Sequence, residues 1–255
     1  MHLAAIWIYP IKSLDGVSIP AAEITSGGSL RHDRAWMLVD AAGNTVNAKR
    51  EPRVHQIRSQ YDVKTKQVTL SAADVTPETI DLNDLPRLAG WFSRYFAQPI
   101  TVQYNPHVGF PDDLESPGPT VISLGSLATM ARWFPGVTAE KMRQRLRPNL
   151  ILDDCEPFAE DRLFGPPGER VTFGIGNVRF LGNNPCQRCV VPSRDPQTGE
   201  TTPKFQADFA KQREETLPAF VSRGRFSHFY RAAVNTIVSE SETGIWLRVC
   251  DTVNL

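Results

Sequence analysis

Hydrophobic positions in the first part of the chain follow the pattern of β-strands joined by tight turns. Residues 3–10 are apolar and β-favouring, and residues 35–40 (AWMLVD) lead through a Gly/Asn turn to a second β-favouring stretch at residues 45–48. Residues 55–63 alternate polar and apolar side chains, a TKQ turn follows, and residues 68–71 run back. We therefore expect this part of the chain to be mostly antiparallel β-structure.

The apolar spacing changes to that of amphipathic helices in three places. In residues 85–96 apolar side chains recur every three or four positions, and Asp84 is a residue suited to capping the first turn. Ser123 can cap a second helix that runs to Phe134. Residues 139–146 predict a third, short helix with a basic polar face. These helices are few, so the chain is still expected to be mainly β.

Strands return in the second half of the chain, without the regular strand–helix alternation of a nucleotide-binding sheet. They are predicted at residues 148–152, 171–174, 178–181, 230–238 and 245–249. Residues 105–119 are rich in proline, glycine and acidic side chains, which marks a boundary or a long functional loop. We therefore predict two domains, over residues 1–104 and 105–255, and no doubly wound fold.

Composition and charge exclude several classes of protein. Of the 255 residues, 41% are hydrophobic and 22% charged, and 28 basic residues balance 28 acidic ones. This balance argues against a nucleic-acid-binding surface, which usually carries a basic excess. The longest apolar run, residues 3–11, is about half the length of a membrane helix. This run does not look like a secretory signal, and four cysteines are too few for a disulfide framework, so a cytoplasmic protein is expected.

The densest chemistry lies in residues 183–199, NNPCQRCVVPSRDPQTG. Its pair Cys186 and Cys189 is compatible with half of a zinc site, a redox-active dithiol, or two buried cysteines in a loop. Zinc would need two further ligands, and the other two cysteines are isolated. A redox dithiol usually opens a helix, whereas the residues that follow here favour extended chain and a turn. The fourth alternative is one activated thiolate, which the neighbouring Arg188 would favour.

Three further clusters place polar side chains at the ends of predicted strands. YPIKSLDG brings Lys12 and Ser13 to the end of the first strand, and HDR, ahead of AWMLVD, contains Arg34. In RLRPNLIL the proline fixes extended backbone that would hold Arg147 and Asn149 at the mouth of a strand, where a guanidinium can bind an anion with two donors. Taken singly, each cluster is also compatible with a structural role.

Other polar residues carry weaker signals. Glu160 and Asp161 are adjacent in an irregular segment, which favours a structural hydrogen-bonding role, and His228 favours a surface or capping role. The glycine-containing segments GIG and SGGS lack the spacing and setting of dinucleotide- or phosphate-binding loops. We interpret both segments as turns.

Taken together and in this order, the four clusters resemble the MOSC family, the domains related to the C-terminal part of molybdenum cofactor sulfurases. The branch that contains the mitochondrial amidoxime-reducing component is the most similar. YPIKS and HDRAW resemble its N-terminal β-barrel domain, and RPNLIL, FAED, CQRC and DPQTG resemble the MOSC domain proper. The resemblance covers nearly the whole chain. It implies a mainly β (α+β) fold, with an N-terminal β-barrel-like domain over residues 1–104 and a MOSC β-barrel with a few short helices over residues 105–255.

The resemblance also implies a molybdenum cofactor, Mo-molybdopterin, bound between the two domains. Cys189 matches the family's molybdenum ligand and is the expected catalytic and metal-binding residue, with Cys186 beside it or in the core. The branch's interdomain Thr-Ser pair falls near Ser116 and Pro117. The residues expected to bind the cofactor are Lys12, Ser13, Arg34, Ser116, Arg147, Asn149, Gln187 and Arg188. A molybdopterin needs a soft thiolate, several cationic groups and a dry pocket, which this set would supply.

The activity implied by the resemblance is the two-electron reduction of a small N-oxygenated (N-hydroxylated) compound at molybdenum. The alternative is a non-enzymatic carrier of molybdopterin, or of sulfur as a Cys189 persulfide. The sequence has neither the cysteine spacing of an iron–sulfur site nor a dinucleotide fingerprint, so we expect a separate electron-donor protein of the ferredoxin, flavin or haem type. If Arg147 points inward, Lys141, Arg143 and Arg145 are expected to stay exposed as the basic patch that attracts this donor.

Overall fold

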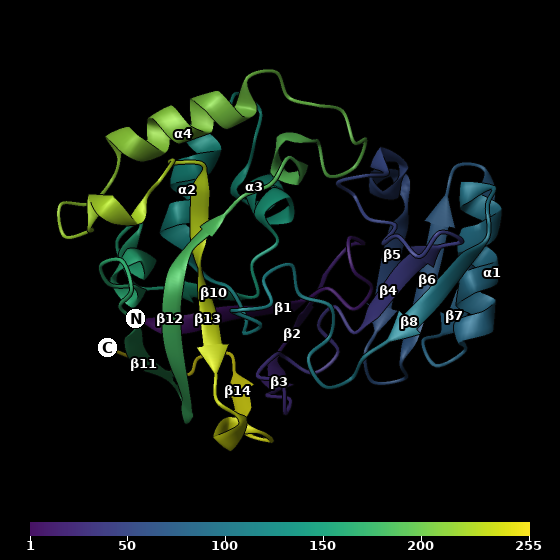
Figure 1. Ribbon diagram of the computed structural model, residues 1–255, viewed down its shortest axis with the longest axis horizontal. Coiled ribbons are helices and arrows are strands. Elements are labelled where there is room, and N and C mark those ends of the chain that lie inside the picture. The colour runs from purple at the N-terminus through teal and green to yellow at the C-terminus, as the bar shows by residue number, and fades with distance from the viewer.

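The computed structural model describes the whole chain, residues 1–255, as strands with a smaller helical part (Figure 1). The strands are β1 (His2–Ile8), β2 (Val17–Ile19), β3 (Ala21–Glu23), β4 (Trp36–Asp40), β5 (Arg58–Asp62), β6 (Gln67–Ala72), β7 (Val75–Asp81), β8 (Ile100–Tyr104), β9 (Val121–Ser123), β10 (Leu150–Asp153), β11 (Val171–Ile175), β12 (Val178–Gln187), β13 (Arg231–Val238), β14 (Trp246–Arg248) and β15 (Val253–Asn254). The α-helices are α1 (Leu85–Phe96), α2 (Leu124–Arg132), α3 (Ala139–Leu146) and α4 (Phe205–Glu215). Short 3₁₀ helices lie at Pro52–Gln56, Ala159–Leu163, Val191–Ser193, Arg223–Arg225 and Glu240–Glu242. The predicted mainly β (α+β) fold is confirmed.

Eight strands form the largest sheet, in the order β15-β11-β12-β13-β9-β10-β1-β2. Neighbouring strands are antiparallel except β9 and β10, which are parallel. The N–H of Leu3 donates to the Asp251 carbonyl at 2.9 Å, and the N–H of Cys250 donates to the Leu3 carbonyl at 2.8 Å. Because these bonds join β1 to the segment before β15, the sheet curves round on itself and the two chain ends lie near each other (Figure 1).

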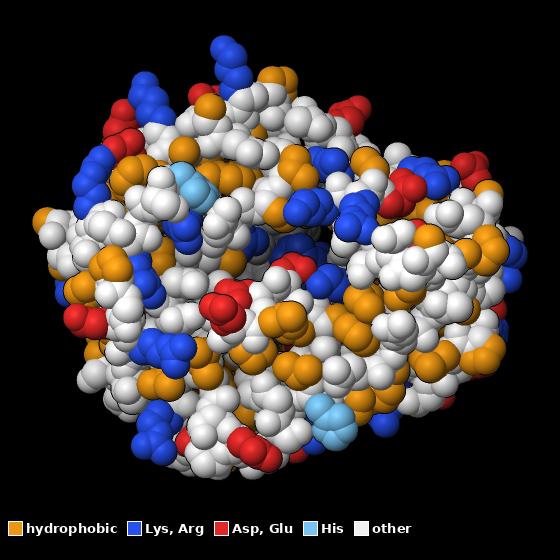
Figure 2. All heavy atoms as spheres, viewed as in Figure 1, with side chains coloured by type: hydrophobic (Ala, Val, Ile, Leu, Met, Phe, Trp, Pro, Cys, Tyr) orange, Lys and Arg blue, Asp and Glu red, His pale blue; other side chains and the backbone are white.

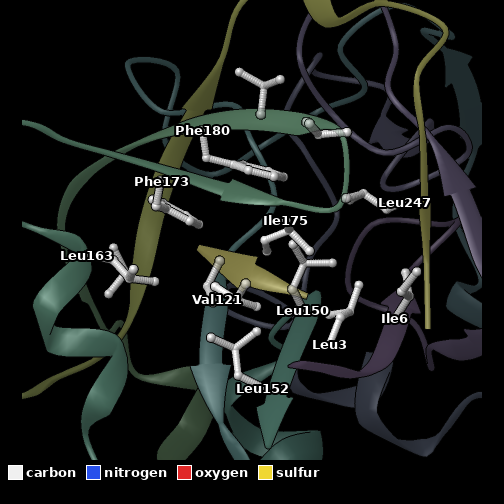
Figure 3. Packing of buried hydrophobic residues seen from close by; sticks show 14 of the residues in the cluster. Leu3, Ile6, Val121, Leu150, Leu152, Leu163, Phe173, Ile175, Phe180 and Leu247 are labelled. Carbon is white, nitrogen blue, oxygen red and sulfur yellow. The ribbon is translucent and has the colours of Figure 1, made fainter. Parts of the chain in front are cut away.

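The interior of this curved sheet is one hydrophobic core built from both halves of the sequence. Leu3 and Ile6 of β1 pack in the same cluster as Leu150 of β10 and Phe180 of β12 (Figure 3). All four side chains are fully buried, and each such burial contributes about 1.5–3 kcal/mol. β1 and β2 therefore belong to the sheet of the second half of the chain, and β3 pairs with β14. The domain boundary expected between residues 104 and 105 stays a prediction.

The residues from β4 to β8 build a second lobe with its own core. β4 pairs with β8, and β5, β6 and β7 form a three-stranded antiparallel sheet. α1 begins where the Asp84 side chain accepts a hydrogen bond from the Arg87 N–H at 3.1 Å, and it ends at Ala97, which has a left-handed backbone. Trp91 and the other apolar side chains of α1 are buried in the core of this lobe. Both predicted bounds of this helix are confirmed.

The helices α2, α3 and α4 lie together on the outer side of the large sheet (Figure 1). Val121 and Leu150 of β9 and β10 point into the curved core, whereas their neighbours Ile122 and Ile151 pack in the cluster formed with the helices, as the alternation of side chains along a strand requires. The Ser123 hydroxyl caps α2 as predicted. The region next to the cavity described below is therefore supported by two packed cores.

Several elements differ from the sequence-based expectation. The elements β2, β3, β7, β8, β9, β15 and α4 were not predicted. The return strand expected at residues 45–48 is reduced to a single bridge between Val39 and Thr45. Among the helices, none has the length and apolar character needed to span a membrane.

Candidate functional site

A cavity of about 340 Å³ lies where the two lobes meet, and residues of both lobes line it. Figure 2 shows Lys and Arg side chains around the hollow on this face. The lining includes eight cationic side chains and four acidic ones, although the whole chain carries no net charge. The lining cations are Lys12, Arg34, Arg58, Arg143, Arg145, Arg147, Arg188 and Arg194. The cavity is therefore suited to an anionic ligand.

Tyr9, the residue that follows β1, lies beneath two of these cations. Its N–H donates to Asp33 Oδ1 at 2.8 Å, and its hydroxyl donates to the Pro148 carbonyl at 3.0 Å. The guanidinium carbons of Arg34 and Arg147 lie 5.0 and 4.1 Å from the centre of its ring. Burial raises the pKa of Tyr9. The neutral ring therefore offers a π-face that helps to hold two like charges close together.

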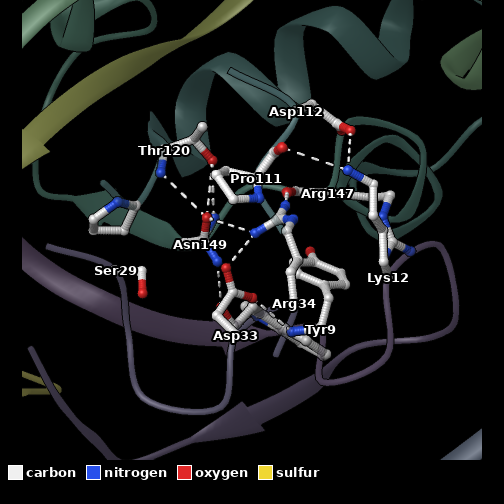
Figure 4. A network of polar contacts seen from close by, with 12 residues as sticks. Tyr9, Lys12, Ser29, Asp33, Arg34, Pro111, Asp112, Thr120, Arg147 and Asn149 are labelled. Atoms are coloured by element: carbon white, nitrogen blue, oxygen red, sulfur yellow. Dashed lines mark hydrogen bonds and ion pairs between the residues drawn. The ribbon is translucent and has the colours of Figure 1, made fainter. Parts of the chain in front are cut away.

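Arg34 is fixed by a network of polar contacts (Figure 4). It forms an ion pair with Asp33, and its Nη1 donates to Asn149 Oδ1 at 3.2 Å. Asn149 is buried; its Oδ1 also accepts from the Thr120 N–H at 3.2 Å, and its amide donates to a carbonyl of β1 at 3.0 Å. Asn149 therefore uses its polar atoms within the protein, and its role here is to position Arg34.

Arg147 differs from Arg34 because no carboxylate lies within 4.0 Å of its guanidinium. Its Nη2 is shielded from solvent and has no hydrogen-bond partner, and burial lowers the pKa of the group. Arg147 ends α3 with a left-handed backbone, φ 53°, and Ser13 and Arg34 also have positive φ, 75° and 50°. Such angles are unfavourable for residues with a side chain and cluster at functional sites. The tertiary structure therefore imposes the backbone conformation of these three residues.

Lys12 ties the predicted interdomain loop to the cavity. Its Nζ donates to the Phe110 carbonyl at 2.9 Å and pairs with Asp112 at 2.7 Å. Asp113 of the same loop accepts a hydrogen bond from Asn235 of β13 at 2.9 Å. The loop therefore runs from one lobe to the other beside the cavity. We call the following three residues the cationic cluster: Lys12, Arg34 and Arg147.

Cys186 and Cys189 line another part of the same cavity. Arg188 Nη1 lies 3.1 Å from the Cys186 sulfur, and Nη2 donates to the Leu146 carbonyl. The guanidinium thus contacts Cys186, whereas the sequence led us to associate it with Cys189. The charge of Arg188 interacts favourably with both sulfur atoms. Cys189 is exposed and Cys186 partly buried, and no third His, Cys, Asp or Glu joins them as a metal-binding group. We call Cys186, Arg188 and Cys189 the thiol cluster.

The structure brings all but one of the predicted site residues to the cavity. Those that line it are Lys12, Ser13, Arg34, Ser116, Arg147, Asn149, Arg188 and Cys189. Gln187 is exposed and does not line it. Because side chains alternate along extended chain, Cys186 and Arg188 face the cavity while Gln187 points away. Ser116 is buried, and its hydroxyl accepts a hydrogen bond from Asn183 at 2.8 Å.

The predicted exposed basic patch is wrong for two of its three members. Arg143 and Arg145 are buried, with 6% and 4% of their surface exposed. Arg143 pairs with Glu140 at 2.5 Å, and Arg145 donates to the Pro192 carbonyl at 2.8 Å. Both side chains lie between α3 and neighbouring segments, which a helical pattern alone does not reveal. Lys141 remains partly exposed.

The remaining polar candidates lie outside the cavity. Glu160 and Asp161 are buried in the 3₁₀ helix Ala159–Leu163, where Asp161 pairs with Arg213 of α4. Burial raises the pKa of Glu160 to about 7. His228 is partly exposed in the loop before β13. These positions are compatible with the structural roles expected for them.

The cavity has cations without acidic partners and polar groups that were not predicted. Carboxylate partners are present for Lys12, Arg34, Arg58 and Arg143. The cations without one within 4.0 Å are Arg145, Arg147, Arg188 and Arg194. Tyr9, His55, Asp112 and Arg194 were not predicted to belong to the site. Tyr9 and Arg194 have a local signal, since Tyr9 begins the YPIKS motif and Arg194 lies in the segment of residues 183–199. Unpaired guanidinium groups next to thiols can hold a ligand that combines anionic oxygens with a soft metal.

Family models match most of the chain. A model of the MOSC N-terminal beta barrel domain matches residues 1–98, and a model of the MOSC domain matches residues 120–253. The cationic cluster draws on both matched segments, since Lys12 and Arg34 lie in the first and Arg147 in the second. The thiol cluster lies in the second alone.

Relatives among characterised proteins cover most of the chain at low identity. Mitochondrial amidoxime-reducing component 1 of Homo sapiens is 27% identical over 85% of this chain and 73% of that protein. Mitochondrial amidoxime reducing component 2 of Rattus norvegicus is 26% identical over 77% of this chain and 68% of that protein. A molybdenum cofactor sulfurase of Oryza sativa is 24% identical over 78% of this chain, but the match spans only 29% of that longer protein.

Proposed function

Because the chain belongs to the MOSC domain family, we propose that it is a molybdenum-cofactor-binding oxidoreductase that reduces small N-hydroxylated compounds. The similarity to amidoxime-reducing components supports this activity. One structural observation carries the proposal: Arg147, shielded and without an acidic partner, lines the same cavity as the thiols of the thiol cluster. An anionic, thiol-binding ligand would satisfy both.

The residues present fit a molybdopterin. Cys189 would supply the protein thiolate to molybdenum, because it is the exposed thiol of the pair. The cationic cluster would hold the phosphate, and the unpartnered Nη2 of Arg147 would donate to it. Ser13 and Ser116 line the same wall and would add hydroxyl groups. Gln187 takes no part in this proposal.

When bound, the cofactor supplies the two-electron redox chemistry. In the proposed reaction the N–O bond of the substrate breaks, two electrons and two protons are consumed, and water is released. The chain's own residues would bind the cofactor and orient it in the cavity. Tyr9 holds the two arginines in place, Asn149 fixes Arg34, and the Lys12 contacts to the loop of residues 105–119 close one side of the cavity.

We propose that a separate ferredoxin, flavin or haem protein supplies the electrons. The absence of an iron–sulfur cysteine spacing and of a dinucleotide fingerprint in the sequence supports this proposal. Free thiols agree with a reducing compartment such as the cytoplasm. With Arg143 and Arg145 buried, Lys141 alone of the expected basic patch could contact the donor.

A second candidate function is the transfer of sulfur as a Cys189 persulfide. The exposure of Cys189 and the proximity of Arg188 to the thiol pair favour it, since a neighbouring guanidinium stabilises an anionic sulfur. The relative from rice bears the name of a cofactor sulfurase. We find no carboxylate or histidine close to the two cysteines that would add support for this function.

Metal analysis of the purified protein separates the two candidates. Bound molybdenum, together with turnover of an N-hydroxylated compound under an artificial reductant, is the result expected for the reductase. A metal-free protein with a persulfide on Cys189, detected by mass spectrometry, would contradict the reductase and support the carrier. Addition of a nicotinamide donor alone should give no turnover, because the electron donor is a separate protein.

A further inference from the structure

Two polar groups of the cavity wall have no task in either cluster. Arg194 follows Cys189 by five residues in the loop after β12, and His55 lies in the 3₁₀ helix Pro52–Gln56 of the other lobe. Both line the cavity. Arg194 and His55 come from different lobes, so this part of the cavity wall is formed by the contact between the two lobes.

Close contacts fix the positions of both groups. Arg194 Nη1 donates to the Ala48 carbonyl, and Arg58 Nη2 donates to the Pro196 carbonyl at 3.3 Å. Gly199, with φ 77°, approaches the 3₁₀ helix so closely that a Cβ there would lie 3.3 Å from the His55 Cβ. The turn of residues 195–199 therefore holds the imidazole against one side of the cavity.

The hydrogen-bonding capacity of these two side chains is largely unused. Neither ring nitrogen of His55 has a protein partner, and only 8% of the residue is exposed. Apart from the bond to Ala48, the N–H groups of Arg194 have no partner, and no carboxylate lies within 4.0 Å of them. The Nε2 atom of His55 is shielded from solvent, and leaving such a buried polar group unsatisfied costs free energy. A ligand that hydrogen-bonds to this nitrogen would remove the cost, and the N–H groups of the partly buried Arg194 are available to the same ligand.

The charges around His55 favour an anion at this place. Burial, together with the nearby cations Arg194, Arg147 and Arg58, lowers the pKa of His55 to about 4, and Asp195 opposes this shift. Arg58 is balanced by Asp15 at 3.2 Å. At neutral pH the imidazole is therefore uncharged, with one N–H group that can donate a hydrogen bond. It lies among guanidinium groups, two of which have no carboxylate partner.

We propose that Arg194 and His55 form a second anion subsite, beside Arg147, that binds a carboxylate or phosphate group of the molecule in the cavity. The identity of that molecule rests on the proposed function: the anionic group belongs either to the N-hydroxylated substrate or to a nucleotide extension of the cofactor. Both sources offer the same chemistry, an oxygen anion that accepts charge-assisted hydrogen bonds. We call Arg194 and His55 the Arg194 subsite.

Binding of inorganic phosphate to the cofactor-free protein tests the subsite without any molybdenum. Calorimetric titration is expected to show two sites in the wild type and one in Arg194→Gln, or a phosphate affinity about ten- to hundredfold lower for one of the two sites. His55→Gln should weaken the same site. Arg53→Gln is the matched control, because Arg53 lies on the same 3₁₀ helix, is exposed and pairs with Glu51. Unchanged phosphate binding in both Arg194→Gln and His55→Gln would overturn the proposal.

Two further measurements on the loaded protein distinguish the sources of the anion. If the anion is a nucleotide phosphate, the extracted cofactor releases a nucleotide on hydrolysis, and Arg194→Gln retains less of it. If the anion belongs to the substrate, Arg194→Gln raises KM for a carboxylate-bearing hydroxylamine about ten- to hundredfold more than it raises KM for a neutral hydroxylamine. If Arg194→Gln changes neither the amount of retained nucleotide nor the KM for the carboxylate-bearing substrate, the assignment of the subsite to this ligand is wrong.

The two proposals fail separately. A protein that binds phosphate at the Arg194 subsite but contains no molybdenum refutes the proposed function and leaves the subsite standing. A molybdenum enzyme whose phosphate binding ignores Arg194 refutes the subsite and leaves the proposed function standing.

Discussion

The cationic cluster and the thiol cluster line one cavity but are built in different ways. In the cationic cluster, Lys12 and Arg34 each have a carboxylate partner, and Arg34 is also fixed by Asn149. In the thiol cluster no carboxylate is present, and Arg188 contacts the sulfur of Cys186. The clusters adjoin at the end of α3, because the carbonyl that Arg188 binds belongs to Leu146, the residue before Arg147.

This difference separates residues that stabilise the fold from residues that serve the ligand. A charge held by a buried partner cannot be removed without leaving the partner unpaired, so Arg34 supports stability as well as binding. Arg147 has no such partner, so we expect its charge to serve the proposed ligand more than the fold. The exposed Cys189 packs little, so its removal should affect chemistry and spare the fold.

The largest effect is expected from Cys189→Ser. The hydroxyl is a poor ligand for a soft metal centre, so activity should fall below detection while the thermal midpoint of the protein stays unchanged. Cys186→Ser is the matched control, and it should retain molybdenum. Full activity of Cys189→Ser would contradict the assignment of this residue.

Substitutions in the cationic cluster should have opposite effects on stability. Arg34→Met leaves Asp33 unpaired and should lower the free energy of unfolding by about 3 kcal/mol, whereas Arg147→Met removes an unpaired charge and should be neutral or raise it by about 1 kcal/mol. Urea unfolding of the cofactor-free proteins measures both. The affinity for the cofactor should fall about ten- to hundredfold in both variants. If Arg147→Met destabilises as much as Arg34→Met, the contrast between the two arginines is wrong.

His55 should make the stability of the cofactor-free protein depend on pH. Its folded-state pKa, about 4, lies below the ordinary value of 6.5, so the unfolded chain binds more protons between these values. Stability should therefore be greatest above pH 6.5 and fall by about 1–3 kcal/mol as the pH drops towards 4. His55→Gln should remove this component of the pH dependence, measured by urea unfolding at a series of pH values. An unchanged profile would show that His55 is not held neutral by the cavity.

The smallest effect is expected from Lys141→Ala. Lys141 pairs with Asp195 at 3.5 Å and is 41% exposed, so its loss should change stability by less than about 0.5 kcal/mol. Because it is the one exposed member of the expected basic patch, the rate of electron transfer from a donor protein should fall modestly and only at low salt. A large loss of stability would place Lys141 among the structural residues of α3.

Local signals were sufficient where a residue acts on its neighbours in sequence. Asp84 and Ser123 cap the helices that their positions predict, and the alternation of apolar residues gives β11 and the start of β12. α4 was missed because Lys204, at its start, supplies no side-chain cap and few of its residues are buried. β7 was missed because most of its side chains are exposed.

The candidate site could be predicted in part from motifs that lie at strand ends. Lys12, Arg34 and Arg147 reach the cavity as expected, while Gln187 points away by strand alternation. Arg145 was expected to be exposed because nothing in the helical pattern indicates that the Pro192 carbonyl, from a distant loop, accepts its hydrogen bond. The pairing of such groups depends on the tertiary fold.

The most direct test of the account is the sulfur coordination of molybdenum, measured by X-ray absorption at the molybdenum edge of the purified, loaded protein. We expect the wild type and Cys186→Ser to have the same number of sulfur neighbours, and any molybdenum retained by Cys189→Ser to have one fewer. An unchanged sulfur count in Cys189→Ser, or a loss of one sulfur in Cys186→Ser, would contradict it.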